Sequence, residues 1–152
     1  MDFKILEYKD IPFLNDIRNE CREFLHNNSY YTLEETYNWF EKINPEFYII
    51  YHDKNKIGYF RTSDLNDNNI YIGCDIHKDF RGFGYGYLAY KEFIPFIINK
   101  HKLKILYLEV LASNIRAFNL YIKLGFQEIQ RFDIIRDGEK VENIKMVYQI
   151  KK

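Results

Sequence analysis

The stretch IYIGCDIHKDFRGFGYGYLAY, residues 70–90, decides how the rest of the chain is organised. Its apolar, β-branched beginning predicts a strand, and its end opens a long helical pattern. Between them, Gly82, Gly84 and Gly86 lie within five residues, which costs chain entropy unless the backbone bends tightly or a ligand approaches it closely. Free N–H groups at a helix start, with the positive end of the helix dipole behind them, suit phosphate oxygens. The turn therefore predicts an anion site, and a pyrophosphate is the first hypothesis.

Bulk composition describes a single globular domain covering residues 1–152. Hydrophobic residues make up 47% of the chain and charged residues 29%, which is not the composition of a disordered protein. Lys and Arg number 22, as do Asp and Glu, so bulk charge favours neither a nucleic acid nor an anionic membrane as a partner.

The cysteines and histidines do not predict a metal site. Cys21 and Cys74 lie far apart in the chain, and none of the four histidines has a zinc-ligand spacing. Residues 1–4 do not begin the apolar segment of a signal peptide, and no apolar run reaches the roughly 20 residues that a bilayer span needs. The expectation is a cytoplasmic protein without a metal.

Hydrophobic periodicity and turn residues predict eleven elements in the order β-α-α-β-β-β-α-β-α-β-β, an α/β arrangement with a mixed sheet. The strands are expected at 3–8, 47–51, 57–62, 70–76, 103–110, 126–135 and 141–150. The helices are expected at about 13–25, 33–42, 87–100 and from Asn114 to Leu124, where Gly125 ends the last one.

Two segments together carry a resemblance to a known family. Residues 81–86, RGFGYG, look like the Q/R-x-x-G-x-G/A signature of the GCN5-related N-acetyltransferase (GNAT) superfamily. Residues 108–126, LEVLASNIRAFNLYIKLGF, resemble its second signature, L-E-V-x-x-x-N-x-x-A-x-x-x-Y-x-x-x-G-F, at every fixed position. The glycine motif alone is weak, but both signatures in this order and element context are specific. The resemblance implies the GNAT fold, a central, mostly antiparallel seven-stranded sheet flanked by about four helices.

The resemblance also implies where acetyl-CoA binds. The backbone of the glycine turn would hold the pyrophosphate, the preceding strand would pair with the pantetheine arm, and Asn114, besides capping a helix, would contact the cosubstrate. The implied cosubstrate-binding residues are Cys74, Asp75, Ile76, Arg81, Gly82, Phe83, Gly84, Tyr85, Gly86, Tyr87, Asn114 and Tyr121.

Two side chains are implied to be catalytic. Tyr121 is similar to the tyrosine whose hydroxyl protonates the departing CoA thiolate, although it could be one more core aromatic. Glu109 is similar to the glutamate that acts as general base in N-terminal acetyltransferases, and in other members this glutamate is structural. Cys74 could form an acyl-enzyme, but a small thiol on a central strand is more often part of the packing.

The acceptor amine is the least explicit part of the sequence. In the superfamily the acceptor site is built from the first two helices and the last hairpin, which makes Arg18, Asn19, Arg22 and Trp39 candidates. These residues resemble both amino-sugar and ribosomal-protein acetyltransferases, and they could equally be a solvated helix face and a core tryptophan. A small-molecule amine is the first hypothesis: an amino sugar, free or linked to a nucleotide, a polyamine, an amino acid or an aminoglycoside.

A peptide or protein amine is the second hypothesis, and a GNAT-fold protein that binds acyl-CoA without transferring it is the third. The protein is expected to be a monomer or homodimer, and the predicted reaction is direct attack of an amine on the thioester, without a metal or an acyl-enzyme.

Overall fold

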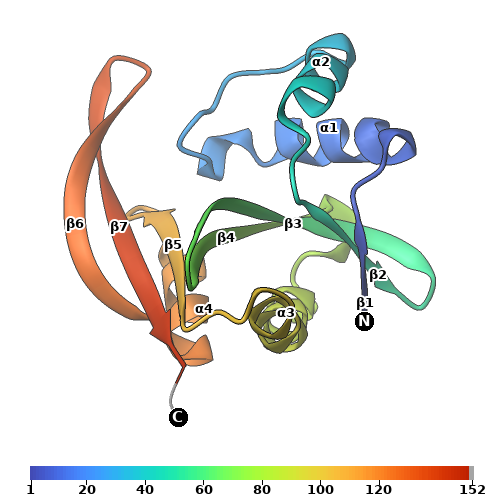
Figure 1. Cartoon of the computed structure of the whole chain (residues 1–152). Helices are drawn as coiled ribbons and strands as arrows, with labels where there is room; N and C mark the ends of the chain where they lie inside the picture. The colour runs from blue at the N-terminus through green and yellow to red at the C-terminus, as the bar shows by residue number, and fades with distance from the viewer. Residues whose placement is uncertain (151–152) are drawn as a thin grey trace.

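The computed structural model describes residues 1–150, and in it one seven-stranded sheet runs through the whole molecule (Figure 1). The strands are β1 (Asp2–Ile5), β2 (Tyr48–His52), β3 (Asn55–Asn66), β4 (Asn69–Ile76), β5 (Ile105–Leu111), β6 (Gln127–Arg136) and β7 (Glu139–Gln149). The helices are α1 (Ile11–Glu20), α2 (Leu33–Ile43), α3 (Tyr85–His101) and α4 (Ile115–Leu124), joined by short 3-10 turns. The predicted element order and the mixed sheet are confirmed.

The strands lie in the order β1-β2-β3-β4-β5-β7-β6, and only β4 and β5 are parallel neighbours. These two pair over just three residues each, Asn69–Tyr71 with Ile105–Tyr107. Beyond them, β4 still pairs with β3 as far as Ile76, and β5 still pairs with β7 as far as Leu111. The sheet is therefore split between β4 and β5, which leaves backbone hydrogen-bonding groups on both sides of the gap.

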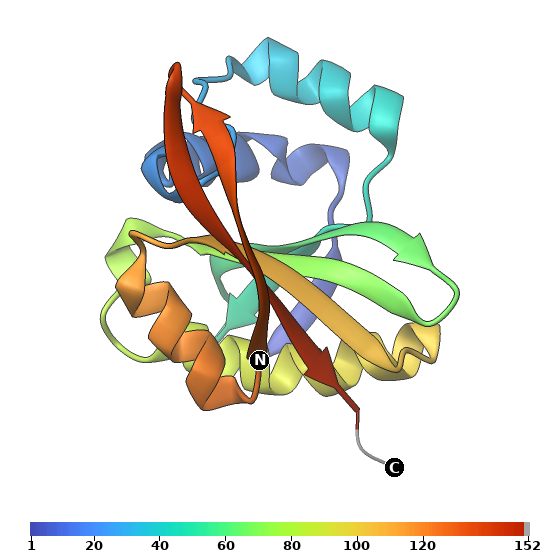
Figure 2. The ribbon, with the colours of Figure 1, turned by 90° about the vertical axis from the view of Figure 1, so that its left-hand side faces the viewer.

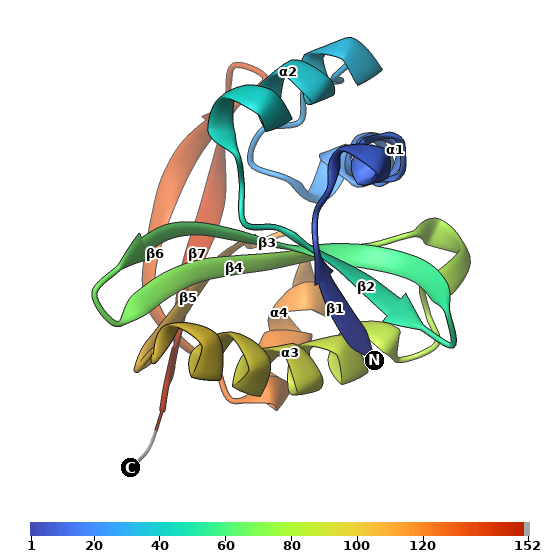
Figure 3. The same cartoon turned by 45° about the vertical axis from the view of Figure 1, so that its right-hand side comes forward.

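Helices cover both faces of this sheet, α1 and α2 one face and α3 and α4 the other (Figure 3). Side chains alternate along the strands, so β3 sends Phe60 into the core under α3 and Tyr59 into the smaller core under α1. In the same way β5 places Leu108 and Val110 in the α3 core, which turns Glu109 toward the opposite face.

The first helix is shorter than predicted. The periodic apolar residues suggested a helix to Leu25, but α1 ends at Glu20 and a 3-10 turn, Arg22–Phe24, follows. The apolar residues keep a helix-like spacing beyond Glu20 because the 3-10 turn is also helical, although its hydrogen bonds are no longer those of an α-helix. The capping box predicted at Thr32 and Glu35 is present, and α2 begins at the next residue, Leu33.

The segment between α1 and α2 lies beside the tip of the β6–β7 hairpin (Figure 2). Asp137 and Gly138, both with positive φ, form the predicted hairpin turn. Within residues 1–150, no helix is both long and apolar enough to cross a membrane.

Candidate active site

The glycine turn leaves the start of α3 open to a ligand. Gly82 and Gly84 have φ values of +83° and +82°, in the left-handed region that favours glycine, and Gly84 caps the helix. The first helical backbone bond runs from the Leu88 N–H to the Gly84 carbonyl, and no side chain caps this end. The N–H groups of residues 85–87 are therefore without a helical partner, which is the arrangement that the proposed pyrophosphate site requires.

A cavity of about 370 Å³ occupies the split between β4 and β5. Among the predicted residues, its lining includes Cys74, Asp75, Glu109, Asn114 and Tyr121. Ile76 and residues 81–87 lie beyond it, at the end of β4 and the start of α3. The chain thus forms a path from the helix N-terminus to the split in the sheet, which suits a long ligand with phosphates at one end.

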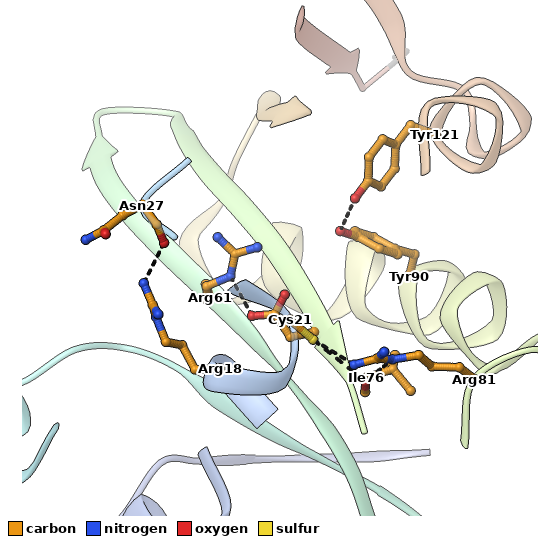
Figure 4. A network of polar contacts seen from close by, with 9 residues as sticks. Arg18, Cys21, Asn27, Arg61, Ile76, Arg81, Tyr90 and Tyr121 are labelled. Carbon is orange, nitrogen blue, oxygen red and sulfur yellow. Dashed lines mark hydrogen bonds and ion pairs between the residues drawn. The ribbon is translucent and has the colours of Figure 1, made fainter. Parts of the chain in front are cut away.

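Tyr121 reaches this cavity from α4, on the α3–α4 side of the sheet. Its hydroxyl lies 3.4 Å from that of the buried Tyr90 (Figure 4). Burial raises the pKa of Tyr121 above its usual value, even though the hydrogen bond with Tyr90 lowers it. The phenol therefore keeps its proton at neutral pH and can donate a hydrogen bond into the cavity.

Glu109 reaches the same cavity from the opposite face of the sheet and belongs to a three-residue network. The side-chain amide of Asn143, on β7, donates to Glu109 Oε1 at 2.8 Å. Its carbonyl oxygen contacts Nε2 of His26, which lies 3.7 Å from Glu109 Oε1. Asn143 is fully buried, so its amide fixes the carboxylate and the imidazole relative to one another.

The Glu109 carboxylate determines which atoms of this network donate hydrogen bonds and which accept them. An ionised Glu109 can only accept, so the NH₂ group of Asn143 must face it and the amide oxygen must face His26. Nε2 of His26 is therefore the donor, and in the neutral ring Nδ1 keeps its lone pair. The network leaves two acceptors at one end of the cavity, the Glu109 carboxylate and the His26 ring.

Sequence reasoning missed His26 and Asn143. His26 belongs to the segment after α1 and Asn143 to the middle of β7, and neither stands in a recognisable motif. The usable signal was Asn143 itself, a polar residue at a strand position that alternation directs inward.

A second cavity, of about 660 Å³, lies between α1, α2 and the sheet. Its lining includes the predicted Arg18 and Trp39, whereas Asn19 and Arg22 line neither cavity. The two cavities share three residues, Leu25, His26 and Arg61. The second cavity is therefore the candidate acceptor site, and it joins the first next to the Glu109 network.

The predicted acceptor residues make mostly internal contacts. Both terminal nitrogens of Arg18 donate to backbone carbonyls of the segment after α1, one of them to Asn27 at 2.6 Å (Figure 4). Asn19 exchanges hydrogen bonds with the backbone of Tyr31, and the Arg22 guanidinium lies 5.7 Å from the ring centroid of Tyr30. These side chains hold the wall of the acceptor cavity in place.

That wall is tied to the β6–β7 hairpin. Asn28 donates to the Asp137 carboxylate at 2.6 Å, and Arg136 donates to the backbone carbonyls of Arg22 and Glu23. These bonds bridge the α1–α2 segment and the hairpin.

Neither cysteine is an activated thiol. Burial raises the pKa of Cys74 well above its usual value and that of Cys21 to about 12. Cys21 and the Ile76 carbonyl both accept hydrogen bonds from Arg81, at 3.0 and 2.9 Å, which ties the glycine turn to α1 (Figure 4). Within residues 1–150, no three histidine, cysteine or acidic side chains are grouped to hold a metal ion.

A fold with a split parallel strand pair, a glycine turn at a helix start and a tyrosine in the split is that of an acyl-CoA-dependent transferase. The model of the acetyltransferase (GNAT) family matches residues 11–126. The chain belongs to this family, and it is an acetyl-CoA-dependent N-acetyltransferase.

Solved structures show the same fold at low sequence identity. Spermidine N-acetyltransferase from Vibrio cholerae, in complex with CoA and spermine, has a TM-score of 0.89 at 18% identity, over 97% of this chain and 94% of that one. Ribosomal-protein-alanine N-acetyltransferase from Brucella melitensis has a TM-score of 0.82 at 18% identity, over 99% and 100%. A putative phosphinothricin N-acetyltransferase has a TM-score of 0.85 at 17% identity, over 99% of each chain. No curated protein matches the sequence.

Proposed function

We propose that this protein transfers the acetyl group of acetyl-CoA to the primary amine of a small molecule by direct attack. The observation that carries the proposal is the junction of the two cavities, where the Glu109 network meets the split that holds Tyr121. Placing an amine and a thioester together at such a junction supplies much of the acceleration.

The residues of the chain have separate tasks in this reaction. Acetyl-CoA, held by the backbone of residues 82–87 and by the open edge of β4, supplies the activated acyl group. Glu109 takes the proton from the amine, directly or through the His26 ring, so that the nitrogen lone pair can form the new C–N bond. A free N–H on the open edge of β4 stabilises the oxyanion.

Tyr121 serves the other side of the reaction. As the C–S bond breaks, the thiolate gains negative charge and accepts a hydrogen bond from the Tyr121 hydroxyl. A thiol is ordinarily more acidic than a phenol, and burial widens that difference by raising the pKa of Tyr121. Tyr121 therefore acts chiefly by stabilising the leaving thiolate, which takes up a proton from solvent once it has left, while Glu109 passes the proton of the amine to solvent.

The contacts between the α1–α2 segment and the β6–β7 hairpin favour a small molecule over a peptide. A peptide must run out of the site through an open groove, and the space between the α1–α2 segment and the β6–β7 hairpin is bridged by the Asn28 and Arg136 bonds. Cys74 has no role as a nucleophile in this proposal, since its raised pKa leaves it as the thiol at neutral pH.

The test measures CoA release with a panel of small amines and a panel of peptides with free N-termini. We expect turnover with members of the first panel and no incorporation of labelled acetyl groups into the protein. Calorimetry with acetyl-CoA reports on the cosubstrate site independently of the acceptor, so binding without turnover would mean that the acceptor is absent from both panels. Turnover confined to peptides would contradict the small-molecule assignment.

A further inference from the structure

Arg61 stands where the two cavities meet, and the proposed reaction gives it no task. It lies on β3 opposite Gly73 of β4, on the sheet face that α1 and α2 cover, and it lines both cavities. The Arg61 side chain is 39% exposed to solvent, so part of it is accessible from the cavities.

Within residues 1–150, the two terminal nitrogens of the Arg61 side chain have no hydrogen-bond partner. Its Nε lies 3.2 Å from a carboxylate oxygen of the buried Asp75, which holds the inner side of the guanidinium. Among residues 1–150, neither Nη1 nor Nη2 of Arg61 makes a hydrogen bond, whereas both terminal nitrogens of Arg18 are bound to backbone carbonyls. Arg61 therefore presents unused donors to the cavity junction.

The sequence makes room for this arrangement at Gly73. A Cβ added there would lie 2.6 Å from Nη2 and 2.7 Å from Cζ of Arg61, so the guanidinium rests directly over the glycine backbone. Any larger residue would push the guanidinium away, and Gly73 thus fixes where the free donors lie.

The Arg61 guanidinium stays positively charged over the whole pH range in which the protein would be assayed. Burial by itself lowers the pKa of Arg61, but the neighbouring Asp75 raises it further, and the group stays cationic. A planar cation with two free terminal nitrogens matches a carboxylate or phosphonate, which it binds through paired charge-assisted hydrogen bonds.

The rest of the acceptor cavity is largely apolar. Leu14, Trp39, Phe47 and Tyr59 line it, with the rings of Trp39 and Phe47 5.2 Å apart. One carboxylate in its lining, that of Glu35, accepts a hydrogen bond from Thr32 in the capping box of α2, and the Glu109 carboxylate lies in the adjoining cavity.

Resting on the proposed transferase function, we propose that the acceptor is an amine that carries an oxyanion close to the nitrogen and an apolar body, as in an apolar α-amino acid. Arg61 holds the oxyanion, the Glu109 network receives the ammonium, and the apolar cavity takes the side chain. A polyamine offers Arg61 only positive charge, and a peptide N-terminus has an amide where the oxyanion should be.

The first test compares matched ligands on the unaltered protein. L-Phenylalanine, phenylalaninamide and phenethylamine share one apolar body and one amine, and only the first carries the oxyanion. We expect the amino acid to exceed the other two by about 10- to 100-fold in kcat/KM, and in affinity by calorimetry in the presence of CoA. The aminophosphonate analogue of phenylalanine distinguishes a carboxylate from a tetrahedral oxyanion, and leucine and methionine extend the series.

The second test moves or replaces the guanidinium. Gly73→Ala displaces it without removing charge, and Arg61→Lys keeps the charge but not the planar fork. Both are expected to reduce the preference for phenylalanine over phenylalaninamide by about tenfold. The matched control is Arg131→Gln, an exposed arginine on β6 that lines neither cavity, for which the ratio stays at its original value. Circular dichroism and acetyl-CoA affinity report on folding and on the cosubstrate site.

The outcomes separate this inference from the transferase proposal. Acetylation of amines with no preference for an oxyanion overturns the role of Arg61 and leaves the transferase intact. Failure of every oxyanion-bearing amine to bind, whatever the transfer assay shows, overturns it as well. If Gly73→Ala and Arg61→Lys keep the full preference, Arg61 only braces β3 against β4.

Discussion

The proposed acetyl-CoA site is built from neighbours in the chain, and the proposed acceptor site is assembled from distant segments. The split, the glycine turn, Asn114 and Tyr121 all fall within residues 70–126. The acceptor cavity needs α1, the segment after it, α2 and β3, and its wall is tied to a hairpin more than a hundred residues away.

This difference suggests how the two sites can vary. In the proposed sites the cosubstrate would be held largely by backbone groups, whose positions depend on strand pairing and on two positive φ angles rather than on side-chain identity. The acceptor would contact side chains such as Arg61, Trp39 and His26, which substitution changes without altering the strands. One fold can therefore keep its cosubstrate and exchange its acceptor.

The largest expected effect is at Tyr121, where the two sides meet. Tyr121→Phe should lower kcat by about 10²- to 10³-fold, because the leaving thiolate loses its hydrogen-bond donor, and should leave acetyl-CoA affinity nearly unchanged. Steady-state kinetics and calorimetry measure the two quantities. Tyr90→Phe is the matched control, since it removes only the partner hydroxyl at 3.4 Å and should have the smaller effect. Full turnover in Tyr121→Phe would contradict the assignment.

Glu109 tests the acceptor side in the same way. Glu109→Gln retains an oxygen that can accept from Asn143 but cannot take up a proton, so kcat should fall by about 10- to 100-fold without loss of fold. Asn143→Ala keeps the carboxylate but releases both it and His26, and it should raise KM for the amine as well as lower kcat. If Glu109→Gln has no effect while His26→Ala does, the imidazole is the base.

The residues proposed to bind the cosubstrate could be named from the sequence because they are local. The glycine turn, the capping asparagine and the tyrosine seven residues later belong to two signatures that resemble those of the GNAT superfamily, and Gly84 and Asn114 do stand at the starts of α3 and α4. Asn114 does cap α4, accepting from the Ala117 N–H at 3.2 Å, and Gly125 ends that helix with a φ of +106°.

The acceptor side escaped prediction because it depends on strand register and on loop contacts. Nothing near Arg61 in the chain indicates that it faces Gly73 and Asp75, since that follows only from the pairing of β3 with β4. Arg18, chosen because its place on the first helix resembles that of family members, is occupied by backbone carbonyls. The network of His26, Asn143 and Glu109 joins three segments that only the folded sheet brings together.

The glycine turn offers a smaller and cleaner test of the cosubstrate side. Gly84→Ala meets no atom within 4 Å but must adopt a φ of +82°, which costs about 1–2 kcal/mol and disturbs the start of α3. We expect acetyl-CoA affinity to fall by about tenfold in calorimetry. Gly138→Ala is the matched control, with a φ of +78° and equally open space in the β6–β7 turn. Equal losses of affinity in both variants would mean that the turn only stabilises the fold.

The smallest effect concerns alkaline pH and compares the two cores directly. Burial raises the pKa of Tyr90, on the inner face of α3, and that of Tyr59, under α1, each well above the usual value of 10. As pH rises past about 10, the unfolded chain loses these protons and the folded protein keeps them, so the free energy of unfolding falls with increasing pH.

Each such group contributes a slope of at most about 1.4 kcal/mol per pH unit, and stability from this source is complete below pH 9. Urea unfolding between pH 8 and 11 should therefore show a gentler decline in Tyr90→Phe and in Tyr59→Phe than in the unaltered protein. The two substitutions compare the cores: equal changes in slope mean that both exclude water to the same degree. A change of slope in Tyr90→Phe alone would mean that water reaches Tyr59 through the acceptor cavity that it lines. No change of slope in either variant would show that both phenols ionise in the folded state.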